Sequence, residues 1–544
     1  MDKIDLLLIH PPAFFKRDII FPGPIAETVQ EVTDQFLAFP IGFISIADFL
    51  YKRGFNVKIL NLGELKSLDL FKFFSNLKAD YIGIGLHWCI HSKGAIDLAK
   101  FIKEINPNFK IILGGLTSTR FHYEIIKEFD FIDGIIRGEA EEVLLDLLKR
   151  KSFEDVPNLT YRSGDKIKVN PMRPNISNLD DLNFTNLDLI MFKDKIKSSI
   201  GKWVWNIPIS RGCVYNCKHC GGSSYSYKSL FNRNKPAFRS PEKIIEDIID
   251  LKERGIKRIL LFQDPRIAGR NYWEKLLKLL TKLNIDSLTL ELFYPANEEY
   301  IDLISKINFE VTLTISPESG SERIRFPHGR VYSNSALLKC VEICGEKGVK
   351  LTPFFMTGLG EEDEESRRET RALCEEICRI NTKYLKIREW FNPVFGPMIL
   401  LDPGSLAFDY PELYGYKLIF KNFKDYYEGL SLPSWHQWIS YETKNYSRRD
   451  LAKNMLEDLE FVLDLKERYA TDSSVEGYLL DQEYLNLERY NLYCYKIVAE
   501  ELENCDLNSL MEAYKNRFNE KILPKLKYGE KFLEAFDRSI GLIA

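Results

Sequence analysis

Short apolar segments alternate with amphipathic segments over most of this 544-residue chain, in two blocks separated by a less regular stretch. The apolar segments have the length of buried strands, and the segments between them have helical periodicity. Strands and helices that alternate in this way build parallel sheets covered by helices. The chain also exceeds the roughly 250 to 300 residues at which a single core stops growing. The sequence therefore predicts an α/β protein with more than one domain.

The first block covers residues 1–150 and predicts an open, doubly wound, Rossmann-like parallel sheet. The expected strands are 4–9, 57–62, 81–86, 110–113 and 131–136, and the expected helices are 41–52, 65–77, 95–104 and 123–129. Such sheets bind ligands beyond the carboxyl ends of their strands. The segments found there are His10-Pro11-Pro12, His87-Trp88, Gly114-Gly115-Leu116-Thr117-Ser118 and Gly138-Glu139. The glycines have a simpler explanation too, as tight strand-to-helix turns.

A second block follows a connector at 151–200, in which a hairpin is expected around Arg162-Ser163-Gly164-Asp165. This block covers 201–392. Its expected strands are 204–210, 258–262, 288–292, 311–315, 351–355 and 384–388, and its expected helices are 241–254, 273–283, 298–307, 335–347 and 364–380. Six β/α units make a full or partial barrel, whose chemistry belongs at the C-terminal ends of the strands.

The C-terminal region, 393–544, is aromatic-rich at first and helical from about Arg448. The aromatic stretch 408–441 has two interpretations. Its rings would line an apolar pocket above the barrel, or they would belong to two amphipathic helices that cover it.

Charge and hydropathy exclude some classes of protein. Lys and Arg total 75 against 79 Asp and Glu, a net charge of -4, so a nucleic-acid partner receives no electrostatic support. No apolar run reaches the roughly 18 to 20 residues of a transmembrane helix, and the N-terminus does not resemble a cleavable signal. We therefore expect a cytoplasmic protein, in which ten scattered cysteines are no disulfide framework.

Three of those cysteines stand within eight residues, directly after the first expected barrel strand: Cys213, Cys217 and Cys220. A four-iron cluster takes one thiolate per iron, so three cysteines would leave one iron open for reaction. Zinc is the rival ligand, since the three thiolates and His219 would form a Cys₃His set. The adjacency of His219 and Cys220 disfavours zinc, because structural zinc sites usually draw ligands from two separate knuckles.

The spacing Cys213-x3-Cys217-x2-Cys220 on this loop resembles the signature of the radical SAM superfamily. The resemblance implies a 4Fe-4S cluster on the three cysteines, with S-adenosylmethionine chelated by the open iron and cleaved to a 5'-deoxyadenosyl radical. It also implies an electron donor such as ferredoxin or flavodoxin. Gly221 and Gly222 would give the loop room to admit S-adenosylmethionine.

Other strand ends are similar to family segments in the expected order. Ser316-Pro317-Glu318-Ser319-Gly320 resembles the ESGS-like segment, and 356–361 resembles the segment beside the adenine. The residues that the resemblance implies for S-adenosylmethionine are Gly221, Gly222, Gln263, Asp264, Ser316, Glu318, Thr357 and Gly358. His219 departs from the pattern, since the family commonly has a carbocyclic aromatic residue there.

The first block is similar to the cobalamin-binding domain that precedes the barrel in one subclass of this superfamily, through its segments LLLIHPP, IILGGLTST and IIRGEAEE. The residues implied for cobalamin are Gly114, Gly115, Thr117, Ser118, Gly138 and Glu139. The Asp-x-His-x-x-Gly fingerprint of a lower histidine ligand is absent. The C-terminal region resembles an uncharacterised archaeal and bacterial branch, which brings no substrate with it.

Three functions follow as hypotheses. The first is a cobalamin-dependent radical SAM methyltransferase acting on an unactivated carbon of a small-molecule or lipid substrate. The second is a radical SAM enzyme that forms or rearranges a carbon skeleton, for example of an isoprenoid lipid, without methyl transfer. The third is a non-catalytic metal-binding protein. No motif identifies a catalytic residue. The pairs Cys340/Cys344 and Cys374/Cys378 are expected to pack in the core, and Cys89 is a weaker candidate for function.

Overall fold

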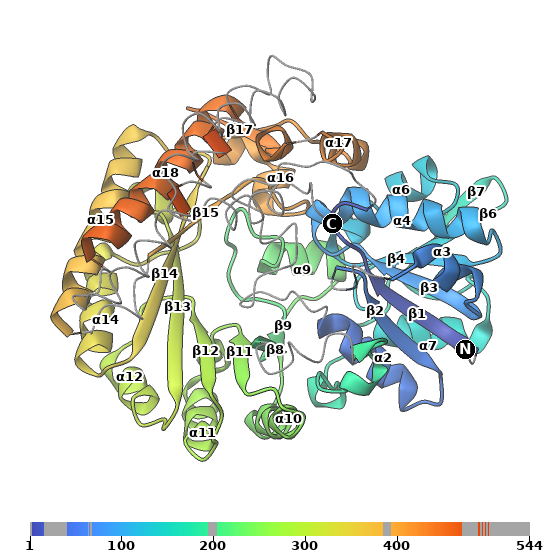
Figure 1. The fold of residues 1–544 in the computed structure, drawn as a ribbon, viewed down its shortest axis with the longest axis horizontal. Coiled ribbons are helices and arrows are strands. Elements are labelled where there is room, and N and C mark those ends of the chain that lie inside the picture. The colour runs from blue at the N-terminus through green and yellow to red at the C-terminus, as the bar shows by residue number, and fades with distance from the viewer. Residues whose placement is uncertain are drawn as a thin grey trace, which may run out of the picture.

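The computed structural model describes residues 3–15, 41–63, 65, 68–193, 204–384, 393–432 and 434–469, together with positions 488, 489, 492, 495, 496 and 499. Figure 1 shows two sheets, one in the blue and cyan N-terminal part and one in the green and yellow middle part, with the orange C-terminal elements across the top of both. The predicted fold class is confirmed: an α/β protein with a Rossmann-like domain, a six-stranded parallel sheet and a helical C-terminal region.

The first sheet has the strand order β2-β1-β3-β4-β5-β6-β7. Its first five strands are parallel, and the hairpin β6–β7 continues the sheet in antiparallel fashion, where the sequence predicted a hairpin. The strands are β1 (Ile4–His10), β2 (Val57–Asn61), β3 (Ala79–Gly85), β4 (Lys110–Gly114), β5 (Gly134–Ile136), β6 (Leu159–Ser163) and β7 (Lys166–Val169).

Helices flank this sheet on both faces, with α2 against α7 and α3 against α4. They are α2 (Ile41–Tyr51), α3 (Leu70–Ser75), α4 (Ser92–Ile105), α5 (Leu116–Arg120), α6 (His122–Glu128) and α7 (Glu141–Arg150). Helix α3 is shorter than the sequence predicted, because Asp69 caps its N-terminus by accepting a hydrogen bond from the Lys72 amide at 3.0 Å.

The second sheet is parallel, in the order β15-β14-β13-β12-β11-β8. Its strands are β8 (Val204–Pro208), β11 (Arg258–Phe262), β12 (Ser287–Leu292), β13 (Glu310–Glu318), β14 (Lys350–Thr357) and β15 (Val394–Pro397). The helices around it are α10 (Pro241–Glu253), α11 (Arg270–Leu280), α12 (Glu298–Ile304), α13 (Glu322–Arg325), α14 (Asn334–Glu346) and α15 (Glu364–Tyr384). Figure 1 shows the larger of these helices along the outer face of a curved sheet.

The prediction of a sixth strand at 384–388 is wrong at its first residue. Tyr384 is the last residue of α15, which no glycine or proline interrupts, and 385–388 lie outside the described residues. The sixth strand of the sheet is β15 instead, just beyond the expected domain boundary at 392.

The C-terminal region contains α16 (Leu406–Asp409), β16 (Tyr416–Leu418), α17 (Phe423–Gly429), β17 (Tyr441–Thr443) and α18 (Arg448–Tyr469). Its aromatic stretch was expected to line a pocket or to cover the barrel, and much of it packs on the first domain. Phe121 contacts both Phe408 and Phe423, and Phe129 contacts Tyr427. Helix α18 is the part that covers the barrel, against α15, β14 and β15.

Two hydrophobic cores run across the domains. One joins the α2 and α7 face of the first sheet to the barrel, and the other joins the opposite face to the C-terminal aromatic stretch. In the described part of the chain, no helix is long and apolar enough to cross a membrane.

Candidate active site at the meeting of the two sheets

The cysteine loop is closed at its base by a short pair of strands. After β8, the strand β9 (Ser210–Arg211) pairs with β10 (Ala237–Phe238), so residues 212–236 leave and re-enter the barrel at one point. Gly212 begins the loop with φ +97°, and a Cβ there would lie 2.9 Å from the Cα of Pro236. Only glycine fits such a turn without strain. The loop, with helix α9 (Ser224–Phe231), is therefore anchored at the mouth of the barrel.

Three thiols on one loop are the donor set that a 4Fe-4S cluster takes, and their binding of a cluster stays a prediction. None is disulfide-bonded, and backbone amides donate to the sulfurs of Cys213 and Cys220, from Tyr215 at 3.4 Å and from Gly222 at 3.3 Å. Such hydrogen bonds stabilise thiolate sulfur. Among the described residues, no three His, Cys, Asp or Glu side chains are close enough to share one metal ion. A cluster does not need that, since each thiolate binds a different iron.

A buried ion pair lies against this loop. Arg330 donates to Glu318 at 3.1 Å, and Glu318 lies 3.8 Å from Nε2 of His219. Burial raises the pKa of Glu318, and Arg330 opposes that rise. Burial, followed by the charge of Arg330, lowers the pKa of His219 to about 4, so this ring is neutral at pH 7. The backbone around Gly329 packs directly on Cys217.

The residues expected to bind S-adenosylmethionine fall into two groups. Gln263 holds the base of the cysteine loop, because it accepts a hydrogen bond from Ser210 and donates to the Gly212 carbonyl at 3.2 Å. Glu318 pairs with Arg330 beside the cysteine loop, and Ser316 is half-buried on the inward face of β13. Gly221 and Gly222 lie in the loop itself. All of these are close to the strand ends where the ligand is predicted.

The other expected residues are engaged by protein partners. Asp264 is fully buried and binds Arg266 at 2.6 Å and the Phe293 amide at 2.8 Å. Thr357 donates to Asp458 of α18 at 2.8 Å, and the Gly358 carbonyl accepts from the Tyr441 hydroxyl at 3.0 Å. Their contact with S-adenosylmethionine stays a prediction.

The residues expected at cobalamin shape the strand ends of the first sheet. Gly115 has φ +120°, and a Cβ there would lie 2.6 Å from the Cα of His87. Thr117 donates to the His87 carbonyl at 2.8 Å, and Ser118 donates to the Gly115 carbonyl at 3.1 Å. A Cβ at Gly114 would meet no atom within 4 Å, so this position is open to a ligand.

The Gly138-Glu139 segment joins the domains. The amide of Gly138 donates to Thr119 at 3.1 Å, while Glu139 accepts from Arg233, which follows α9, at 2.6 Å. The carboxylate of Glu139 is thus directed at the barrel. Its expected contact with cobalamin stays a prediction.

Sequence reasoning missed two acidic residues at the site. Asp402 accepts a hydrogen bond from the Gly221 amide at 2.9 Å, across 181 positions of the chain. Glu291 lies on the inward face of β12 and accepts from the Gln263 amide. Burial raises the pKa of both carboxyl groups. The alternation of Leu288, Leu290 and Leu292 with polar residues was a signal for Glu291.

The remaining cysteines pack in the cores. Cys340, Cys344, Cys374 and Cys378 are buried in the barrel core, as expected, and Cys89 is 5% exposed in the second core. Burial raises the pKa of Cys89 well above its ordinary value. This buried environment disfavours a reactive thiolate at Cys89.

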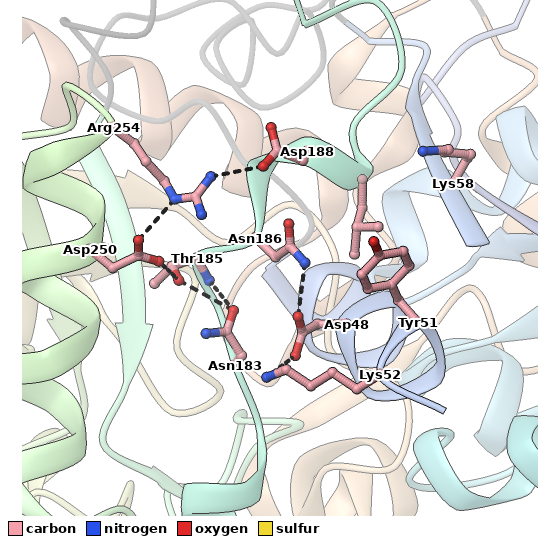
Figure 2. A pocket seen from close by; sticks show the side chains of 11 residues that line it. Asp48, Tyr51, Lys52, Lys58, Asn183, Thr185, Asn186, Asp188, Asp250 and Arg254 are labelled. Atoms are coloured by element: carbon pink, nitrogen blue, oxygen red, sulfur yellow. Dashed lines mark hydrogen bonds and ion pairs between the residues drawn. The ribbon is translucent and has the colours of Figure 1, made fainter. Parts of the chain in front are cut away.

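A separate pocket of about 400 Å³ lies at the other end of the sheets (Figure 2). Its walls come from the end of α2, the start of β2, the connector near 183–189 and the end of α10. Many of its charged groups pair with one another, as Asp48 does with Lys52 and Arg254 with Asp250. None of the expected site residues lines it.

We expect Asp402→Ala to make a bound cluster more labile. The Gly221 amide would lose its acceptor, and an unsatisfied buried amide costs roughly 1 to 3 kcal/mol, so iron should be lost to a chelator about tenfold faster. The measurement is the rate of iron release under anaerobic conditions. Glu412→Ala, at an exposed position of the same region, is the matched control. Equal rates for Asp402→Ala and the wild type would contradict this role.

Comparison with known proteins agrees with this geometry. Residues 207–374 match the radical SAM superfamily, and residues 32–148 match the B12 binding domain. The chain therefore contains a radical SAM domain, with a B12-binding domain ahead of it. A radical SAM domain implies a 4Fe-4S cluster, S-adenosylmethionine and a source of reducing electrons, and the B12-binding domain implies cobalamin.

Curated relatives are distant. The chain is 24% identical over 421 residues to an uncharacterized methyltransferase of Pyrococcus horikoshii, an alignment that covers 74% of this chain and 85% of the relative. It is 23% identical over 336 residues to the anaerobic magnesium-protoporphyrin IX monomethyl ester cyclase of Rubrivivax gelatinosus, covering 57% of this chain and 54% of the cyclase.

Solved structures share the fold. The radical S-adenosylmethionine methyltransferase TsrM from Kitasatospora setae has a TM-score of 0.61 at 13% identity, covering 87% of this chain and 91% of TsrM. The cobalamin-dependent S-adenosylmethionine radical enzyme OxsB, with aqua-cobalamin bound, has a TM-score of 0.61 at 13% identity, covering 99% of this chain and 79% of OxsB.

Proposed function

We propose that this protein is a cobalamin-dependent radical SAM methyltransferase that methylates an unactivated carbon. The observation that carries the proposal is the contact between the two cofactor edges. A Cβ at Gly221, the residue after Cys220, would lie 3.2 Å from Leu116 of the Gly114–Ser118 segment. The loop expected to hold the cluster and the segment expected at the corrin are therefore in direct contact.

When bound, the 4Fe-4S cluster supplies the electron that generates the 5'-deoxyadenosyl radical, and cobalamin carries the methyl group. The protein's own residues would hold the cysteine loop in a fixed position relative to the first domain. Asp402 of the C-terminal region binds the Gly221 amide, and Asp409 accepts from Arg120 of the first domain at 3.0 Å and from Tyr225 of α9 at 2.9 Å. Three regions of the chain therefore meet around the cysteine loop.

The inward face of the barrel supports a substrate of mixed polarity. Side chains alternate along the strands, so that one set packs in the core and the other stays accessible inside the curved sheet. The accessible set includes Asn206, Leu260, Thr289, Glu291, Thr314 and Ser316. A few polar groups among apolar ones are typical of a small-molecule site.

A second candidate is ring formation without methyl transfer. The likeness to the anaerobic cyclase of Rubrivivax gelatinosus favours it, because that relative aligns with more than half of this chain. Both candidates need the cluster and S-adenosylmethionine, but only the methyltransferase consumes a second S-adenosylmethionine as methyl donor.

The products of S-adenosylmethionine separate the two candidates. We expect the protein, reconstituted anaerobically with iron, sulfide and hydroxocobalamin and then reduced, to form both 5'-deoxyadenosine and S-adenosylhomocysteine. Mass spectrometry with S-adenosylmethionine labelled in its methyl group measures both. Formation of 5'-deoxyadenosine without any S-adenosylhomocysteine would contradict methyl transfer and favour the cyclase-like reaction. Absence of both products would contradict both candidates.

A further inference from the structure

Three of the chain's seven histidines gather at one edge of the first sheet. His10 ends β1, His87 follows β3 by two residues, and His91 ends the short 3-10 helix Cys89–His91. Strands β1 and β3 are neighbours in the order β2-β1-β3-β4-β5, which places the topological switch point between them. Open parallel sheets bind their ligand at that point. These imidazoles therefore lie where the ligand of the first domain is expected.

The three rings differ in their surroundings. His10 and His91 are buried, at 6% and 3% exposure, with their ring centroids 5.0 Å apart. His87 is exposed, and its ring contacts Trp88, which is 47% exposed, at 5.5 Å. Within the part of the chain that the structure describes, no hydrogen bond satisfies the imidazole of His87. Of the three, His87 is the ring available to a ligand.

Protein atoms surround the His87 ring, although part of the side chain is accessible to solvent. Burial, followed by the nearby His91 and His10, lowers the pKa of His87 to about 4, as expected for a ring surrounded by protein. At pH 7 the imidazole is neutral, so one ring nitrogen carries a free lone pair. Neutral imidazole is the commonest side-chain ligand of metals in proteins.

The backbone holds His87 in one position. The turn at Gly115 passes so close that a Cβ would overlap His87, and the His87 carbonyl accepts from the Thr117 amide at 3.1 Å and from its hydroxyl at 2.8 Å. The preceding residue, Leu86, is held in the same way by the Gly114 carbonyl and the Ser118 amide. The His87 side chain therefore starts from a fixed backbone position at this edge of the sheet.

We propose that His87 supplies an imidazole nitrogen to the cobalt of cobalamin bound at this edge. It would take the place of the histidine that the Asp-x-His-x-x-Gly fingerprint normally provides. The proposal rests on the B12-binding domain and is independent of whether the reaction transfers a methyl group.

Isotope labelling tests this in the intact protein. The full chain is produced with ¹⁵N-histidine, loaded with hydroxocobalamin and reduced to the cobalt(II) state for electron paramagnetic resonance. An axial ¹⁴N ligand splits each cobalt line into three, and ¹⁵N splits it into two. We expect a triplet in unlabelled protein and a doublet in labelled protein. An unchanged triplet would identify the benzimidazole of cobalamin as the ligand, and absent splitting would exclude any axial nitrogen; either result overturns the proposal.

A variant then assigns the residue. In ¹⁵N-histidine-labelled protein, His87→Ala should lose the doublet while it still binds cobalamin. His122→Ala is the matched control, since His122 pairs with the Thr160 hydroxyl at 2.9 Å, and it should keep the doublet. A doublet that survives in His87→Ala would assign the ligand to another histidine and overturn the proposal. The labelled wild type gives a result even if the variant does not fold.

Discussion

A Cys217→Ala variant is expected to bind no 4Fe-4S cluster and to form no 5'-deoxyadenosine. Cys217 is buried at 7% exposure, between its two partner cysteines in sequence and beneath the Gly329 backbone. Without its sulfur, two irons of the cluster would lack a protein ligand instead of one. The loss should therefore be complete rather than partial. The measurements are iron and acid-labile sulfide per chain after anaerobic reconstitution, and 5'-deoxyadenosine after reduction.

Cys344→Ala is the matched control for this experiment. Cys344 is also buried, at 1% exposure, but it lies in the barrel core on α14. The same substitution there removes a similar volume without touching the loop, so the iron content should stay at the wild-type level. A Cys217→Ala protein with full iron content would refute the ligand assignment. Loss of iron in Cys344→Ala would point to a second cluster at the α14 and α15 cysteines.

Glu141→Gln is expected to lower the free energy of unfolding by about 3 kcal/mol, because it breaks a buried ion pair between the domains. Glu141 begins α7 of the first domain, at 2% side-chain exposure, and Arg211 stands two residues before Cys213. Arg211 donates to both carboxylate oxygens, one of them at 3.1 Å, and Ser45 donates to the carboxylate at 2.8 Å. The neutral amide would leave the buried charge of Arg211 with Glu139, at the longer distance of 3.5 Å, as its remaining carboxylate among the described residues.

The measurement is the urea dependence of unfolding, followed by circular dichroism. Glu442→Gln is the control, since Glu442 pairs at 2.8 Å with a Lys417 side chain that is 79% exposed, and exposed pairs contribute less than about 1 kcal/mol. Adding Arg211→Met to Glu141→Gln should recover part of the loss, because it removes the buried charge that has lost its nearer carboxylate. Equal stability of Glu141→Gln and Glu442→Gln would contradict the stabilising role of the ion pair between Glu141 and Arg211.

The ion pair between Glu141 and Arg211 also predicts that the stability of the protein depends on pH. Burial alone would raise the pKa of Glu141, but the charge and hydrogen bonds of Arg211 outweigh it and hold the pKa below the ordinary 4.5. A carboxyl group of lowered pKa stabilises the fold above its unfolded pKa, and this contribution is lost as the pH falls through its folded pKa. Wild-type stability should therefore fall more steeply below pH 4.5 than that of Glu141→Gln.

Strand positions were predictable because each depended on a local pattern. The apolar runs at 4–9 and 110–113 correspond to β1 and β4, and the alternation at 288–292 lies within β12. The prediction failed at Tyr384, because a long helix without glycine or proline runs into an apolar segment of strand-like composition. The aromatic stretch was placed on the barrel for a related reason: its amphipathic pattern shows that it packs, but not against which surface.

The sequence by itself determined the cluster motif, because Cys213, Cys217 and Cys220 stand within eight residues on one loop and the chemistry of their spacing is local. It also determined the two β/α blocks, since hydrophobic periodicity is a property of short segments. Only the tertiary structure decided how the blocks meet. The contacts of Asp402 with Gly221, of Arg211 with Glu141 and of Arg330 with Glu318 follow from folding, which brings together charges and amides that are far apart in the chain. Exposure likewise distinguishes His87 from His10 and His91, and it depends on which surfaces the completed fold covers.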